Sequence, residues 1–258
     1  MRNKTFWAIV LAMVIMLGSC GKQKRKPLEL QVQTDSIVVD TIVHLNGSDA
    51  PRLTLHLNYK YVKSGNKKAL NEAILRSGIL VPDYYSLEDD TLDVTAAIKL
   101  FTEKYIADYL RDARLIFEQE KDNPEQLNWQ YKVDTEILQG SEEHITYIAH
   151  VRSYEGGEVM PTYTIAKNFN MKTGKLITLA DVFKRNEMEE LTEDIVDELC
   201  DITKCRDLED LQKNGVFKDI APYPTENFSL TDEDITFHYI PGEINLMEKG
   251  TYDVTVNR

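Results

Sequence analysis

A strict alternation of apolar and polar residues runs through RLTLHLNYKYV, residues 52–62. Leucine or tyrosine stands at every second position, which is the period of a β-strand with one buried face. Two further stretches of this type, LNWQYKVDTEIL (127–138) and EHITYIAHVRSYE (143–155), flank Gln139-Gly140-Ser141. A short glycine-containing link between two strand patterns predicts a β-hairpin.

Helical patterns interrupt the strands. The stretch NKKALNEAILRSGI (66–79) consists largely of helix-forming residues. The longer run from Leu92 to Lys121 places apolar side chains near helical spacing, at Ala97, Phe101, Tyr105, Tyr109 and Leu110. We expect this amphipathic helix to end at Asn123-Pro124, because proline cannot continue a helix. A third helical pattern covers residues 180–203.

Short strand patterns follow and close the chain. TYTIAKNFNM (162–171) and KLITL (175–179) flank a tight turn at Lys172-Thr173-Gly174, where glycine supplies a positive φ. NFSLTDEDITFHYIP (227–241) and TYDVTV (251–256) come after the third helical pattern. Strands and helices that segregate along the chain predict an α+β fold with a mainly antiparallel sheet. Residues 28–49, with alternating valines and isoleucines, form either a tether or an edge strand.

The N-terminus carries the pattern of a bacterial lipoprotein signal. Two cations precede an apolar run of 12 residues, Phe6 to Leu17. That run covers roughly 18 Å as a helix and is shorter than the ~20 residues that a membrane span needs. Gly18-Ser19-Cys20 then supplies small residues before a cysteine, as in a lipobox. We expect cleavage after Ser19 and acylation of Cys20; an uncleaved membrane anchor is the alternative.

The expected lipid anchor and the charge of the chain bear on location and partners. Acyl chains on Cys20 attach a protein to the bilayer, since each buried CH₂ contributes ~0.8 kcal/mol. Four cations follow within residues 22–26, without an acidic run that would favour surface export. We therefore expect the periplasmic side of a Gram-negative outer membrane. Loss of Arg2 and Lys4 with the signal moves the formal net charge from -13 to -15, which disfavours nucleic acid and suits basic partners.

Two kinds of modification are predicted from short patterns. Cys200 and Cys205 remain as thiols after processing, and they either form a disulfide or stay reduced and half-buried. A disulfide requires the helix to end near Ile202, because residues five apart on a continuous helix diverge. The pattern Asp-Ser/Thr-aliphatic, an O-glycosylation acceptor in some Gram-negative envelopes, makes candidates of Ser36, Thr41 and Thr91.

The sequence contains no pattern that supports catalysis or a metal centre. Its five histidines are scattered, at His44, His56, His144, His150 and His238. None belongs to a motif of the His-x-x-x-His type, although zinc in enzymes takes three protein ligands and an open position. Gly-x-Ser-x-Gly is also absent. We therefore expect no enzyme activity, no catalytic residue, no metal and no cofactor.

Gly156-Gly157 lies between two strand patterns and raises the question of a phosphate-binding loop. Such a loop needs backbone amides that converge at the N-terminus of a helix. The residues that follow, PTYTIAKNFNM, are of the strand type instead. We predict a bend or bulge in which glycine permits backbone angles that a side chain forbids.

Residues 50–258 resemble a known envelope domain. The landmarks are Tyr154-x-Gly156-Gly157, Asn168-Phe169, Thr173-Gly174-Lys175 and Asn227-Phe228-Ser229-Leu230. Their order is similar to that in the C-terminal domain of the lysozyme-sensing anti-sigma factor RsiV, which also accompanies the deacetylase domain of PdaC. The family usually has a histidine shortly after the glycine pair, where this chain has Glu158-Val159-Met160, and an aromatic residue where this chain has Gly242. The roles of those positions in relatives are not carried over.

The resemblance implies an organisation and a function. Residues 1–19 are the signal peptide and 20–50 a lipidated tether. Residues 51–150 form a smaller N-terminal α+β domain, and 151–258 the RsiV-like C-terminal domain. The implied function is a lipid-anchored, non-catalytic binding protein whose ligand is peptidoglycan or a lysozyme-like cationic protein. A sensor or scaffold, or an accessory subunit of a wall-modifying enzyme such as a polysaccharide deacetylase, is the alternative. The expected ligand surface comprises Tyr154, Gly156, Gly157, Glu158, Met160 and Tyr163.

Overall fold

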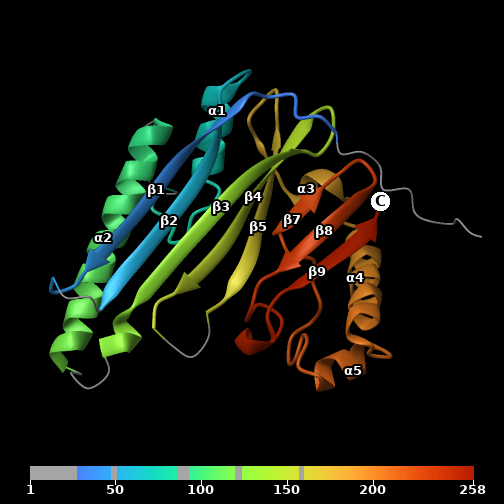
Figure 1. Cartoon of the computed structure of the whole chain (residues 1–258). Coiled ribbons are helices and arrows are strands. Elements are labelled where there is room, and N and C mark those ends of the chain that lie inside the picture. Colours follow the sequence, from blue (N-terminus) through green and yellow to red (C-terminus); the bar gives the residue numbers. More distant parts are fainter. Residues whose placement is uncertain (1–27, 48–50, 86–92, 120–123, 157–159) are drawn as a thin grey trace, which may run out of the picture.

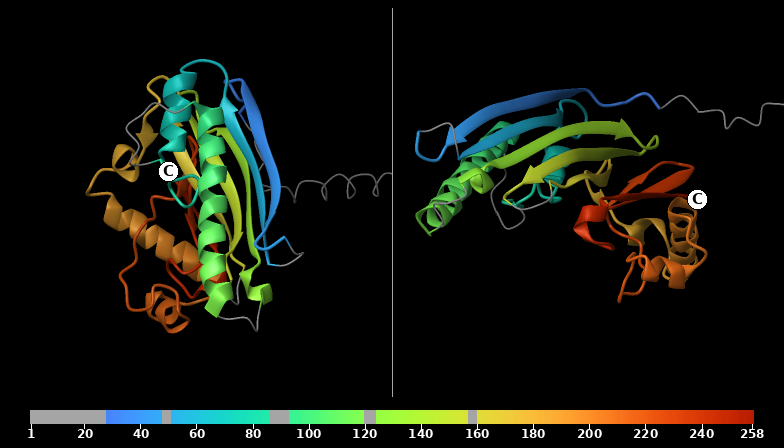
Figure 2. Two further views of the ribbon diagram at one scale, coloured as in Figure 1. Left: turned by 90° about the vertical axis from the view of Figure 1, so that its left-hand side faces the viewer. Right: turned by 60° about the horizontal axis from the view of Figure 1, so that its bottom comes forward.

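A computed structural model describes residues 28–47, 51–85, 93–119, 124–156 and 160–258. It contains two antiparallel-rich sheets, each with helices on one side (Figures 1 and 2). The α+β class that the sequence predicts is confirmed. Cys20, Thr91, Gly157 and Glu158 lie outside the described residues.

The larger sheet has six strands in the order of the sequence, β1 to β6. They are β1 (Thr34–His44), β2 (Arg52–Val62), β3 (Trp129–Gln139), β4 (His144–Tyr154), β5 (Thr162–Asn170) and β6 (Leu176–Ile177). Neighbouring strands are antiparallel, except that β2 pairs with β3 in parallel. That parallel pair requires a crossover connection, and the helices of the N-terminal half supply it.

The crossover consists of α1 (Lys67–Leu75), α2 (Val94–Gln119) and the short 3₁₀ helix η1 (Pro124–Leu127). The side chain of Asp93 accepts hydrogen bonds from the N–H groups of Thr95 and Ala96, at 2.9 and 3.3 Å, and so caps the start of α2. Both longer helices pack on the same side of the sheet (Figure 2). Their apolar residues form one hydrophobic cluster with the inward-facing residues of β2, β3 and β4.

The smaller sheet has three antiparallel strands, β7 (Phe228–Leu230), β8 (Asp234–Tyr239) and β9 (Tyr252–Asn257). They follow α3 (Leu179–Val182), α4 (Met188–Thr203) and α5 (Leu208–Lys213), and η2 (Met247–Lys249) precedes β9. Helix α4 packs on β9, and its residues Leu191, Ile195 and Leu199 share a second hydrophobic cluster with this sheet. The strand alternation therefore places every second residue of β7, β8 and β9 in a core and the intervening ones outside it.

The expected strands and the two longer helical segments of the N-terminal half are found close to their predicted positions. Of the alternatives for residues 28–49, the structure shows an edge strand, because residues 34–44 pair with β2 along their whole length. Strand β4 crosses the boundary expected between residues 150 and 151, so the larger sheet is continuous there. The hydrophobic clusters divide nearer to residue 177. Among the described helices, none is long and apolar enough to span a membrane.

Candidate functional site on the helix-free face

The strands of both sheets have one side that no helix of the described chain covers, which we call the helix-free face. In Figure 1 this side of β1 to β5 and of β7 to β9 is turned toward the viewer, with α1, α2 and α4 behind the strands. Its polar residues alternate with the buried core residues of each strand. They include Asp40, His56, Lys132, Asp134, Glu136, His150, Arg152, Thr164, Ser229, Thr236, His238, Asp253 and Thr255.

Two asparagine side chains join the sheets where β7 lies beside β5. Asn168, which is almost fully buried, donates to the carbonyl of Phe228 at 2.8 Å and accepts from the N–H of Leu230 at 3.1 Å. Asn227 does the reverse: it accepts from the N–H of Ala166 at 2.7 Å and donates to the carbonyl of Thr164 at 2.8 Å. Each amide thus replaces the backbone pairing of a neighbouring strand. The helix-free face therefore continues from one sheet to the other.

A buried histidine supports this junction. His144 Nε2 lies 2.9 Å from the carbonyl oxygen of Leu230, and its Nδ1 lies 2.6 Å from the hydroxyl of Ser141. A carbonyl can only accept, so Nε2 carries the proton and Nδ1 accepts from the serine. The nearby Gly140 has no room for a Cβ, which would come within 2.6 Å of the same carbonyl oxygen. His144 therefore has a structural role.

Three other histidines on this face each contact a carboxylate from a neighbouring strand. His56 Nδ1 lies 2.5 Å from Asp40, and its Nε2 lies 3.4 Å from Asp134. The hydrogen bond to Asp40 raises the pKa of His56 above its usual value. His150 Nε2 lies 3.1 Å from Glu136. These pairs join residues distant in the sequence, which is why the histidines look scattered there.

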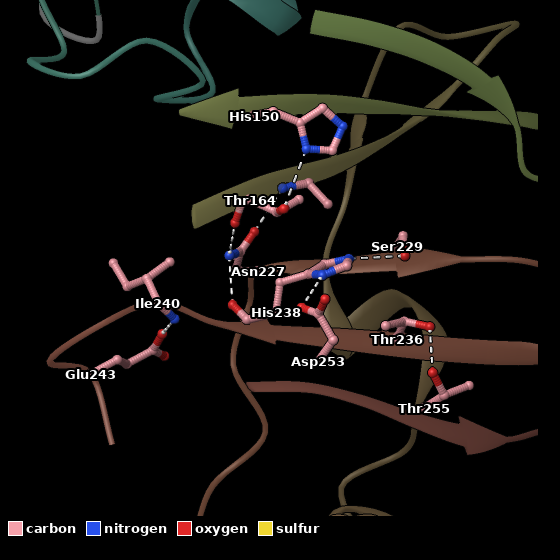
Figure 3. A network of polar contacts seen from close by, with 11 residues as sticks. His150, Thr164, Asn227, Ser229, Thr236, His238, Ile240, Glu243, Asp253 and Thr255 are labelled. Atoms are coloured by element: carbon pink, nitrogen blue, oxygen red, sulfur yellow. Dashed lines mark hydrogen bonds and ion pairs between the residues drawn. The ribbon is translucent and has the colours of Figure 1, made fainter. Parts of the chain in front are cut away.

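The third pair belongs to a contact chain on the smaller sheet (Figure 3). His238 Nδ1 lies 2.8 Å from Asp253 Oδ1 on β9, and its Nε2 lies 3.1 Å from Ser229 Oγ on β7. The hydrogen bond to His238 lowers the pKa of the Asp253 carboxyl. Serine, histidine and aspartate have these same contacts in the catalytic triad of hydrolases. The sequence gives one cue to the arrangement, since all three residues occupy polar positions of alternating strands.

Acyl transfer needs more than the triad contacts. It also needs hydrogen-bond donors that stabilise a negatively charged oxygen, and in α/β-hydrolases the N–H after the nucleophile supplies one. Here that N–H belongs to Leu230, and it already donates to Asn168. The hydroxyls of Thr236 and Thr255, on the same face, bond to each other at 2.9 Å. The trio therefore resembles a triad in its contacts but has this donor position occupied.

The structure separates the residues that were predicted to form a ligand surface. Tyr154 ends β4 opposite Gln130, and Met160 Sδ lies 2.8 Å from Arg152 Nε at the rim of the helix-free face. Tyr163 lies on the other side of β5 and packs against the larger core. Gly156 has a φ of +83°, and a Cβ there would lie 2.7 Å from the carbonyl oxygen of Gln126. The bend expected at this glycine is confirmed.

The remaining sequence-predicted positions are distributed elsewhere. Ser36 is exposed and Thr41 half-buried on β1. Cys200 and Cys205 are free thiols at the end of α4. Within the described part of the chain, no group of three potential ligands is placed to hold a metal ion. Asn168 and Asn227 had appeared only as landmarks of a resemblance; asparagine inside a strand pattern is disfavoured, and that was the available sign of a special role.

Comparison with known proteins supports the fold. No family model matches the sequence, and no curated protein matches it. A solved structure of a DUF3298 family member from Bacteroides fragilis aligns with a TM-score of 0.74 at 22% identity, covering 88% of this chain and 90% of that one. A DUF3298 family protein from Pseudomonas aeruginosa aligns with a TM-score of 0.56 at 13% identity, with the same coverage. The chain therefore shares the α+β fold of solved DUF3298 proteins, while the finer resemblance to the RsiV and PdaC domain stays a prediction.

Proposed function

We propose that this chain is a lipid-anchored, non-catalytic binding protein of a Gram-negative cell envelope, and that its helix-free face binds the ligand. Peptidoglycan and a lysozyme-like cationic protein are the two ligand classes that the resemblance implies. The lipobox at Cys20 supports the location. The observation that carries the binding role is the helix-free face itself, which two sheets share and which presents charged side chains to solvent.

The charges on this face favour the cationic protein. Four carboxylates there keep much of their side chains exposed: Asp40 70%, Asp134 42%, Glu136 43% and Asp253 59%. All four lie beside a histidine, and Asp134 also pairs with Lys132 at 3.2 Å. A basic protein gains affinity and association rate from such complementary charge. Peptidoglycan carries carboxylates of its own, so these four carboxylates gain nothing from it electrostatically.

Exposed apolar side chains lie on the same face and suit a protein partner. Val38 and Ile42 on β1 are more than half exposed, and Leu138 on β3 is 45% exposed. Val38 and Ile42 flank Asp40 on β1, and Leu138 follows Glu136 on β3. Protein interfaces combine apolar contact with a charged rim, whereas wall glycan offers mainly polar groups. The exposed apolar residues therefore favour a protein ligand over peptidoglycan, as the charges do.

Co-sedimentation with purified sacculi tests the proposal, using residues 20–258 with Cys20→Ser so that the protein stays in solution. Pelleting with sacculi alone would establish a wall-binding module. Pelleting only after addition of c-type lysozyme would establish a protein ligand that bridges the two. If the protein stays in the supernatant in both conditions, the proposed ligand classes are wrong.

A charge-neutralising variant assigns the surface. We expect Asp134→Asn with Glu136→Gln to weaken lysozyme binding and to reduce its salt dependence, since fewer charges are then screened. Glu103→Gln with Glu118→Gln on α2 removes the same charge from the helix side of the molecule and is the matched control. Equal weakening by both variants would mean that net charge, and not the helix-free face, drives the binding.

A further inference from the structure

The end of helix α4 brings two cysteines together. Lys204 adopts the left-handed conformation, with φ 62° and ψ 28°, and the chain folds back after it. The carbonyl of Cys200 accepts from the N–H of Lys204 and, at 3.0 Å, from the N–H of Cys205. The second bond is the 6→1 bond of a Schellman motif, which is frequently accompanied by a contact between the side chains at its two ends. Those two side chains are Cys200 and Cys205.

Both cysteines border the same hydrophobic cluster. Cys200 is 8% exposed and belongs to the hydrophobic cluster of the smaller sheet, and Cys205 packs against the same cluster. The Cys205 sulfur also lies 3.5 Å from the Asn214 amide nitrogen. On a helix that continued through Cys205, residues five apart would diverge. The left-handed Lys204 removes that obstacle, because it ends the helix before Cys205.

Cys205 is more accessible to solvent than the buried Cys200. Cys205 lines a surface cavity of about 540 Å³, together with Lys204, Asn214, Lys249 and Tyr252. Cys200 is not among the residues that line this cavity. A soluble or protein oxidant would therefore reach Cys205 first, and Cys200 would then complete the reaction from inside the fold.

We propose that Cys200 and Cys205 form an intramolecular disulfide in the mature protein, with a thiol oxidase of the envelope as the disulfide donor. The Cys205 thiolate attacks the donor disulfide, which forms a mixed disulfide and releases one donor thiolate. The Cys200 thiolate then attacks the Cys205 sulfur, forms the Cys200–Cys205 bond and releases the second donor thiolate. The chain loses two thiol protons and two electrons, and the donor disulfide is reduced. The supply of oxidant depends on the envelope location given under the proposed function.

The bond would act on the binding face through α4. Helix α4 packs on β9, the strand whose other side carries Asp253 and Thr255. A covalent closure at the end of α4 holds its last turn against the core behind these residues. The disulfide thus supports the part of the helix-free face that the smaller sheet contributes.

Thiol trapping tests the proposal on the full chain expressed with its own signal. Cells are quenched in acid, the protein is denatured and alkylated with N-ethylmaleimide, then reduced and alkylated with a second, heavier maleimide. We expect peptide mass spectrometry to find the second label on both Cys200 and Cys205. The first label on both would overturn the proposal.

Two further measurements test whether the folded chain can form the disulfide outside the cell envelope. The folded chain lacking residues 1–19, with Cys20→Ser, is made in a reducing cytosol and then treated with oxidised glutathione. We expect it to lose both free thiols as a monomer, and the variant Cys205→Ser to form no internal bond. Retention of two free thiols, or covalent dimers of the unsubstituted chain, would overturn the geometric argument. Neither outcome depends on whether sacculi or lysozyme are bound.

Discussion

Replacing Asn168 with alanine should weaken the junction between the two sheets and lower the free energy of unfolding. The substitution leaves two polar groups without their partner, the Phe228 carbonyl and the Leu230 N–H. The Thr146 hydroxyl loses its 2.8 Å bond to Asn168 Oδ1 but still lies 3.5 Å from the Leu230 carbonyl oxygen. A buried group left unsatisfied costs roughly 1–3 kcal/mol. For two such groups we therefore expect a loss of about 2–6 kcal/mol in the free energy of unfolding, a large part of the roughly 5–15 kcal/mol of a typical protein.

Equilibrium unfolding in urea measures this loss and locates it. In the chain without its signal, Trp129 is the remaining tryptophan, and it packs against the core of the larger sheet. Its fluorescence therefore reports on that sheet, while far-ultraviolet circular dichroism reports on both. For Asn168→Ala we expect the two signals to separate, because the smaller sheet has lost its anchor and unfolds at lower urea.

Asn58→Ala is the matched control, since Asn58 lies partly exposed on β2 of the same face, away from the junction. It should change stability by no more than about 0.5 kcal/mol. Asn168→Ala with Asn227→Ala should cost less than the sum of the single variants, because either one already opens the junction. If Asn168→Ala is as stable as Asn58→Ala, then the Asn168 side chain does not hold the two sheets together.

Gly174→Ala should lower the melting temperature more than Gly65→Ala. Both glycines have a positive φ, but a Cβ at Gly174 would come within 2.7 Å of α1, whereas Gly65 has open space around it. The hydrogen bond to Asp40 raises the folded-state pKa of His56, so its stabilising effect is complete below the unfolded pKa of about 6.5 and disappears as the pH rises through the folded value. His56→Gln should therefore lower the melting temperature more at about pH 5.5 than at about pH 8.5, and an equal effect at both would contradict this. Ser229→Ala should leave any hydrolysis of p-nitrophenyl acetate unchanged, and loss of a measurable rate would show that the trio on the smaller sheet is catalytic.

The secondary structure was largely predictable, because it depends on local periodicity. Leucine and tyrosine at every second position specify β2, and the spacing of Phe101, Tyr105 and Tyr109 specifies α2. The left-handed Gly174 was also predictable, since the turn between two strands required it. These features follow from side chains that lie near one another in the sequence.

The arrangement of the elements was not predictable in the same way. The parallel pairing of β2 with β3 depends on how α1 and α2 pack across one side of the sheet. The histidine and carboxylate contacts on the helix-free face depend on strand register: His238 meets Asp253 because these positions are paired. The β5–β7 junction depends on two amides that join strands some 60 positions apart in the chain. A periodic pattern identifies a strand but does not select its neighbour.

The parallel pairing of β2 and β3 also determines the order in which the protein can fold. Strands β1 and β2 are complete at residue 62 and can pair from then on, but β3 begins only at Trp129. Until then the apolar side of β2, with Leu53, Leu55 and Leu57, has only the first two helices to cover it. Pairing across so long a segment is slow, because the entropy of closing the loop is lost before the stabilising contacts form. During that interval the nascent chain is exposed to aggregation, so it should depend on a holding chaperone more than its stable final fold suggests.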